Sequence, residues 1–443
     1  MAIGLVGSPT TFTSGATSTT TITLNVPAGV VNGQLLLAVL TIDGGSSATI
    51  TPPAGWTLAN RTNSSTLIAQ GLYYRIANTE PASYSWTTSN RNSSAVMAAY
   101  SGVDPNTPLI GVATRASTST TSSLAGATVS PANETAFALE FVSTRNTTAA
   151  VTVNTVSSGY TLRADVSNTA SAWMETILED NNIFTAPVRG HTVGTMTVSA
   201  SVTDQVECAV CLNPQVSSTK LAIEQMALGV GSGGTASTGT FSTGYANELL
   251  VAFIASDVAG DIVTDVSDTA GLTWTAVINP GTANGGGVGI YYALAATQVV
   301  NDAVTATVTT ATANVDIGLY CLVNAVSPYI GATVSNTSAS GTPTTSLTTT
   351  ANNSWVIAAG VASTSPVIGA ATGSVISSAV GFVAGTAMAW AERMTNTGSP
   401  SGTAATVALA PVTVAYGQVA VEILAQANTL APIQSEITLL GNG

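Results

Sequence analysis

The chain has 443 residues, of which only 7% are charged, and 22 acidic residues against 9 basic ones give it a net charge of −13. Phosphate groups are bound by clustered Lys and Arg, so this composition argues against nucleic acid and against an anionic membrane surface as partners. A chain of this length needs two or three domains, and its 45% hydrophobic content favours folded domains over disorder.

The N-terminal segment "MAIGLVGSPTT" has neither a basic region nor a long apolar stretch, so we expect no signal peptide. The longest apolar runs, such as "LLLAVL" at 35–40, are far shorter than the roughly 18 residues of a membrane-spanning helix. The apolar content is therefore expected in buried strands.

Strand signals follow one another along the chain. "TTTITLNV" (19–26) alternates with a period of two, which predicts a half-buried strand. "LLLAVL" is continuously apolar, as expected of a strand covered on both faces. "GLYYRIA" (71–77) places adjacent tyrosines on opposite faces, and we expect Tyr74 inside and Tyr73 outside. No segment has a helical stripe with caps, so about eight to ten antiparallel strands are predicted per roughly 200 residues.

The chain also repeats itself. "NGQLLLAVLTID" (32–43) matches "ANELLVAFIASD" (246–257), and "GLYYRIA" matches "GIYYALA" (289–295). Further on, "PANETAFALEFVST" (131–144) matches "TANNSWVIAAGVAS" (350–363). A repeat of this kind indicates one structural plan used twice.

We therefore predict an all-β protein built from two tandem antiparallel β-sandwich domains of jelly-roll or lectin-like type. The first spans 1–213 and the second, homologous domain spans 222–426. A linker at 214–221 joins them, and a tail at 427–443 has no counterpart after the first domain.

The segments "PPAGWTL", "EPASYSWT" and "AAYSGVDPNTPLI", in this order, resemble a β-sandwich module of bacteriophage virion proteins and some bacterial surface proteins. The second repeat keeps the pattern only in outline, because Leu322 and Asn324 replace Gly102 and Asp104. The resemblance implies a structural or adhesive module and brings no catalytic residues.

A W-x-E pattern occurs at the same place in both repeats, in "AWMETI" (172–177) and "AWAERM" (389–394). Two residues apart on a strand, the Trp and the Glu share one face. A Trp ring can stack on a sugar while the carboxylate accepts hydrogen bonds from its hydroxyls. The alternative is a Trp that covers the sandwich edge and a solvated Glu. The candidate glycan-binding residues are Trp173, Glu175, Trp390 and Glu392.

An acidic segment, "DVAGDIVTDVSD", gives a candidate calcium site, because calcium accepts several loop oxygens. Its members are Asp257, Asp261, Asp265 and Asp268. Their spacing is not that of the twelve-residue calcium loop, so a polar loop of isolated turn residues is the alternative, and no other cofactor is expected.

No catalytic set is expected. Cys208 and Cys211 form a C-x-x-C, but residues three apart on a strand face opposite ways, which favours small buried thiols. The single histidine, His191, has no nucleophile nearby. We expect no enzyme activity; a glycan-degrading enzyme would need a second carboxylate in register, and none repeats.

The tail contains an apolar stretch with Ile437, Leu439 and Leu440, which we expect to dock on a neighbouring subunit. The function expected from these features is a non-enzymatic phage virion component, either a capsid decoration protein or a head or tail appendage on the particle surface. Its partners would be other virion proteins and copies of itself. The alternative is a carbohydrate-binding adhesin of a fibre or cell surface that binds host glycans.

Overall fold

The computed structural model describes the chain in ten stretches, which are residues 3–129, 137–169, 172–181, 191–216, 220–364, 374–381, 388–394, 401–402, 404–409 and 412–425. Within them the regular structure is β-strand, with one short 3-10 turn, η1 (Gly45–Ser47), and all strand pairs are antiparallel. The predicted all-β, antiparallel fold class is confirmed. No helix in this described part is long and apolar enough to cross a membrane.

The strands of the first half of the chain form two units. Unit 1 contains β1 (Gly4–Leu5), β2 (Thr10–Thr13), β3 (Thr19–Asn25), β4 (Leu35–Asp43), β5 (Ile50–Thr51), β6 (Thr57–Ser64), β7 (Ile68–Ile76), β8 (Ser83–Arg91) and β9 (Ser93–Ser101). Unit 2 contains β10 (Leu109–Ser117), β11 (Thr121–Ala125), β12 (Thr128–Val129), β13 (Phe137–Asn146), β14 (Val153–Thr155), β15 (Thr161–Ser167), β16 (Trp173–Asn181), β17 (His191–Thr192), β18 (Thr195–Val202) and β19 (Asp204–Leu212).

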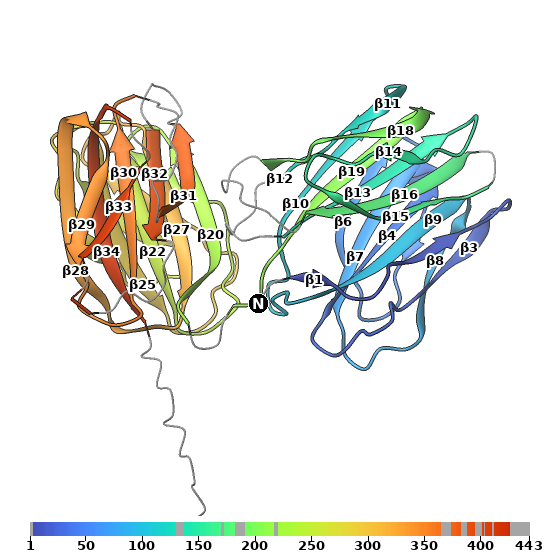
Figure 1. Cartoon of the computed structure of the whole chain (residues 1–443), viewed down its shortest axis with the longest axis horizontal. Helices are drawn as coiled ribbons and strands as arrows, with labels where there is room; N and C mark the ends of the chain where they lie inside the picture. The colour runs from blue at the N-terminus through green and yellow to red at the C-terminus, as the bar shows by residue number, and fades with distance from the viewer. Residues whose placement is uncertain are drawn as a thin grey trace, which may run out of the picture.

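The second half also forms two units. Unit 3 contains β20 (Ala222–Gly231), β21 (Thr235–Ser237), β22 (Glu248–Ser256), β23 (Val263–Asp268), β24 (Thr275–Ile278), β25 (Gly287–Ala295), β26 (Val304–Val308) and β27 (Val315–Val323). Unit 4 contains β28 (Ala325–Gly341), β29 (Thr344–Thr348), β30 (Trp355–Ala362), β31 (Ser374–Gly381), β32 (Met388–Met394), β33 (Ala404–Ala408) and β34 (Val414–Ala425). The two halves form two stacks of strands, drawn blue to green and yellow-green to red (Figure 1).

All four units share one strand order in their main sheet. The first strand pairs with the last, the last with a central strand, and the central strand continues to two more. The orders are β1-β9-β4-β7-β6, β10-β19-β13-β16-β15, β20-β27-β22-β25-β24 and β28-β34-β30-β32-β31. In unit 1, β2 also pairs with β9, so β1 and β2 together take the place of the first strand.

Each main sheet is covered on both faces. Within a half, the two main sheets pack on each other: Leu37 and Val39 of unit 1 share a core with Phe141 and Val210 of unit 2. The equivalent core between units 3 and 4 contains Phe253 and Val421 among others. On the opposite face lies a smaller outer sheet, namely β3-β8-β5, β11-β18-β14, β21-β26-β23 and β29-β33 in units 1 to 4.

This layering explains the continuously apolar strands. In β4, Leu37 faces the core between the main sheets, whereas Ala38 and Leu40 face the outer sheet, where Trp86 is buried. Because both faces are dry, alternate positions do not need polar side chains. The prediction that such strands are covered on both faces is confirmed.

The predicted number of strands is wrong. The described residues hold 19 strands before residue 213 and 15 after residue 222, where about eight to ten per domain were expected. The reason is that β4 (Leu35–Asp43) and β13 (Phe137–Asn146) are the central strands of two successive units rather than different strands of one sandwich. The predicted domain boundaries at 213 and 222 lie next to the end of β19 (Leu212) and at the start of β20 (Ala222), and the division into domains stays a prediction.

Candidate functional site

The first predicted W-x-E pair lies on β16. Trp173 is half-buried, and Glu175 is 1% exposed, with its carboxylate accepting a hydrogen bond from Thr144 Oγ1 at 2.9 Å. The pKa of Glu175 is raised to about 10, mainly by burial and in addition by the neighbouring Asp165, while the hydrogen bond from Thr144 acts in the opposite direction. The carboxyl group therefore belongs to the interior of the sheet and does not face a ligand.

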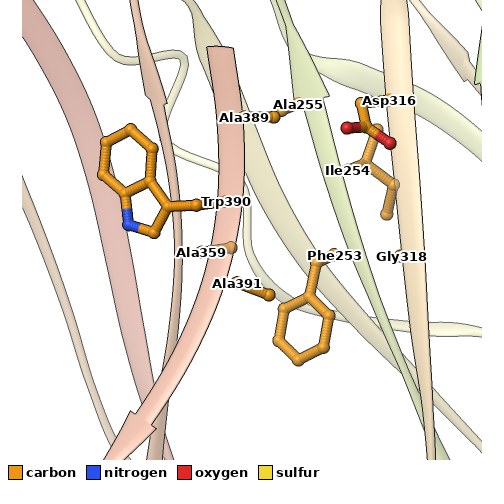
Figure 2. Close-up of a pocket in the computed structure, with 9 residues that line it drawn as sticks. All are labelled: Phe253, Ile254, Ala255, Asp316, Gly318, Ala359, Ala389, Trp390 and Ala391. Carbon is orange, nitrogen blue, oxygen red and sulfur yellow. The ribbon is translucent and has the colours of Figure 1, made fainter. Parts of the chain in front are cut away.

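The second pair lies on β32. Trp390 is 3% exposed and packs with Leu409, Val414 and Tyr416. Figure 2 shows its indole directed away from the Phe253 ring, on the other side of the β32 strand. An exposed Trp390 platform is therefore wrong in this structure, because the outer layer covers the ring. The backbone of Glu392 lies in β32, and its side chain falls outside the described residues.

A small cavity lies between the main sheets of units 3 and 4, beside Phe253, Ala359 and Ala389 (Figure 2). Its volume is about 20 Å³. A space of this size holds one water molecule, for which roughly 10–15 Å³ is required. It is too small for a sugar, so the cavity is a packing defect and not a binding site.

The Trp390 ring packs directly against Gly360, where there is no room for a side chain. A Cβ at Gly360 would meet the indole, so Gly360→Ala should overpack this layer and cost about 1–3 kcal/mol. Trp390→Leu should also destabilise, but the double variant Gly360→Ala/Trp390→Leu should lose less than the sum of the two. Urea unfolding of the four proteins measures this coupling, and additive losses would contradict the contact.

The four predicted calcium ligands are not brought together. Each of them instead accepts hydrogen bonds from its own set of neighbouring residues. Asp257 accepts hydrogen bonds from Asn314, and Asp261 accepts them from Ser256 and Thr310. Asp265 accepts one from Ser267, and Asp268 accepts those of Gly271, Leu272 and Trp274. Among the described residues, no three His, Cys, Asp or Glu side chains could hold a metal ion. The structure therefore favours the alternative interpretation, in which these four residues are isolated turn residues of a polar loop and not a calcium site.

The cysteine prediction is confirmed. Cys208 packs in the core between the main sheets, and Cys211 packs on the opposite, outer face. Both thiols are free and buried, and burial raises the pKa of each to about 12. The predicted docking residues Ile437, Leu439 and Leu440 lie outside the described residues.

Acids that lie within apolar strands form clusters that sequence reasoning missed. In unit 2, Glu140 on β13 is directly opposite Glu179 on β16, and Glu207 is nearby on β19. Burial, and then the Glu179 and Glu207 carboxylates, hold the pKa of Glu140 well above its usual range. Burial raises the pKa of Glu207 to about 7 against the attraction of Arg115. Burial therefore shifts the carboxyl groups of this cluster towards their protonated form.

Glu422 on β34 is the opposite case. Its carboxylate accepts hydrogen bonds from the backbone of Ala332, Thr350 and Ala351 and from the hydroxyls of Thr350 and Ser354, at 2.6–3.1 Å. Burial opposes ionisation, but the hydrogen bonds outweigh it and lower the pKa of Glu422. An ionised carboxylate here fixes the turn that precedes β30.

A third cluster joins the two halves, and we call it the seam. Its residues are Asp104, Thr107 and Asn213 of the first half and Glu224, Tyr245 and Glu248 of the second. Tyr245 donates a hydrogen bond from its hydroxyl to Asp104 Oδ2 at 2.7 Å, and Thr107 donates one to Glu224. Asp104, Glu224 and Glu248 are completely buried.

The seam is acidic and dry. Burial raises the pKa of Glu224 to about 7, and the charge of Asp104 adds to the effect against hydrogen bonds from Thr107 and Gly244. Burial and the Glu224 charge raise the pKa of Glu248 to about 8. At neutral pH the raised pKa values of Glu224 and Glu248 therefore favour the protonated form of these carboxyl groups in the contact between the halves.

These clusters have a sequence signal that could have revealed them. An acid stands inside or at the start of an apolar run in "FALEF", "VECAV", "AIEQM", "NELLV" and "VEIL". In a strand covered on both faces, every such acid must be buried. The signal identifies the buried acids but not which of them meet, because the partners come from different strands and, at the seam, from different halves.

No protein-family model matches the chain, and neither a curated protein nor a solved structure matches it significantly.

Proposed function

We propose that the protein is a non-enzymatic structural component of a phage virion, such as a capsid decoration protein or a head or tail appendage. The observation that carries the proposal is the fourfold repetition of one doubly covered sheet. Stacking the units in pairs makes two thick, rigid bodies whose role is to present surfaces.

The use of the acidic side chains agrees with this role. The sequence patterns suggested several carboxylates as ligand-binding groups. In the structure, Asp268 accepts hydrogen bonds within its own loop, and Glu175 is buried inside a sheet. The resemblance of "AAYSGVDPNTPLI" to phage virion modules points the same way. In addition, residues 221–392 contain no Lys or Arg, so trypsin finds no cleavage site over this stretch. Such a composition suits an exposed particle protein.

The direct test is the protein content of purified particles. Phage from a host that carries this gene would be banded on a density gradient, digested, and examined by mass spectrometry. Tryptic peptides from residues 62–220 would report the first half, and chymotrypsin would supply peptides for the second. We expect the protein at many copies per particle. Its presence in the lysate but not in the banded particles would contradict the proposal.

A tagged host cytoplasmic enzyme, expressed at the same level, is the control for carry-over. Trypsin treatment of intact particles is then expected to leave residues 221–392 uncut while it cleaves at exposed basic sites elsewhere. Immunogold labelling would distinguish the capsid from the tail.

A further inference from the structure

We infer that the groove between the two halves is a binding site for a neutral saccharide. The groove has a volume of about 340 Å³ and lies beside the seam, with Thr107 in both. Ligand pockets usually begin at roughly 300 Å³, so the space is large enough for a small ligand. This site is independent of the W-x-E residues and goes beyond the structural role proposed above.

The residues that line the groove include polar side chains without a hydrogen bond in the described part of the chain. Gln225, Asn301, Tyr74 and Thr240 line it, and within the described residues none of their side chains makes a hydrogen bond. Gln225 and Tyr74 are half-buried, whereas Asn301 and Thr240 are exposed at the rim. Amides donate and accept at once, which suits the paired hydroxyls of a sugar.

The groove also has apolar surface. Leu109, Pro108 and the buried Phe241 contribute to it, together with the ring of Tyr74. Aromatic and aliphatic groups pack on the C–H face of a pyranose while the polar groups bind its hydroxyls. A mixed lining of this kind recognises a molecule that is apolar on one face and rich in hydroxyls at its edge.

Charge decides which saccharides fit. No Lys, Arg, Asp or Glu lines the groove, and the Glu224 carboxyl group lies directly behind Thr107. The chain as a whole carries a net charge of −13. An anionic sugar would meet no cation and would be repelled, so the ligand class is neutral.

The test is saturation-transfer NMR with glucose, galactose, mannose and N-acetylglucosamine, and with glucuronate and N-acetylneuraminate as acidic probes. We expect at least one neutral sugar to bind the full chain with a Kd on the order of 1 mM. The acidic sugars should give no signal. Silence from the whole neutral panel, or equal binding of the acidic sugars, would overturn the inference.

Variants locate the binding. Gln225→Leu and Asn301→Gly each remove an amide, and Gly keeps the positive φ of 52° at position 301. Each should weaken binding about fivefold, the usual effect of one lost hydrogen bond. Asn154→Ala, which removes an exposed amide from the outer sheet of unit 2, should bind as the unaltered protein does.

Thermal unfolding confirms that each variant is folded. If Gln225→Leu does not fold, Thr240→Val replaces it as the second groove variant. Thr240 is exposed and lines the groove, and its side chain makes no hydrogen bond within the described residues, so this change should not disturb the fold. Undiminished binding in the folded groove variants would contradict the assignment to this groove and would show that the sugar binds elsewhere.

Discussion

The protein should be most stable in mildly acidic solution and should lose stability as the pH rises from 5 to 8.5. Several buried acids have pKa values raised in the folded state: Glu207 and Glu224 to about 7, Glu248 to about 8 and Glu175 to about 10. Burial is the largest cause for each of them. In the unfolded chain the same groups titrate near pH 4.5, because their environment is then water.

The direction in which the free energy of unfolding changes with pH follows from proton binding. Above pH 4.5 the unfolded chain releases these protons, while the folded protein keeps them up to about pH 7 or 8, so raising the pH favours unfolding throughout this window. Glu422 acts in the opposite sense: its lowered pKa contributes stability above pH 4.5 that is lost as the pH falls below it. The stability maximum therefore lies close to pH 5.

The expected size is large because each unit of pKa shift is worth roughly 1.4 kcal/mol, so several acids together give a loss on the order of 5 kcal/mol. The midpoint of thermal unfolding should then fall by about 10 °C between pH 5 and pH 8.5. Differential scanning calorimetry at constant ionic strength measures it. A midpoint that stays level or rises over this range would contradict the role of the buried acids.

General repulsion in an acidic protein also lowers stability at high pH, so a control is needed. Glu248→Gln removes a buried acid and should flatten the pH dependence of unfolding above pH 6. Asp265→Asn removes one carboxyl group from an exposed position and should leave the slope almost unchanged. Equal effects of the two variants would assign the dependence to net charge alone.

The second large effect is expected at Glu422. In Glu422→Gln, an amide NH₂ replaces one carboxylate oxygen and faces N–H and O–H donors such as Thr350 and Ser354. Unsatisfied buried donors cost about 1–3 kcal/mol each, and more when a charged acceptor is lost, so we expect a loss of about 3 kcal/mol at pH 8. Glu248→Gln makes the same chemical change and should be neutral or stabilising at this pH.

Comparing the two variants distinguishes an ionised carboxylate that accepts several hydrogen bonds, Glu422, from a buried protonated acid, Glu248. Urea unfolding at pH 8 and at pH 4.5 gives the free energies. The loss in Glu422→Gln should shrink at the lower pH as the carboxylate becomes protonated in the unfolded reference. If Glu422→Gln and Glu248→Gln destabilise equally at pH 8, the distinction drawn from their surroundings is wrong.

The adjacent tyrosines show what the sequence could and could not predict. The alternation of side chains along a strand correctly separates Tyr74, which packs against the core between the main sheets, from Tyr73, which faces the other way. Their counterparts Tyr292 and Tyr291 divide in the same manner. The prediction that Tyr73 lies outside is wrong. Its side chain does point away from the core between the main sheets, but the outer sheet covers that face, so Tyr73 is only 2% exposed.

The sequence by itself determined the all-β class, the doubly covered central strands and the opposite faces of Cys208 and Cys211, since these depend on the period of two within one strand. Only the tertiary structure decided that four units are present, that Trp390 is covered, and that Asp104 meets Glu224 across the seam. The physical reason is that periodicity tells which side chains share a face, whereas what covers that face comes from strands far away in the chain.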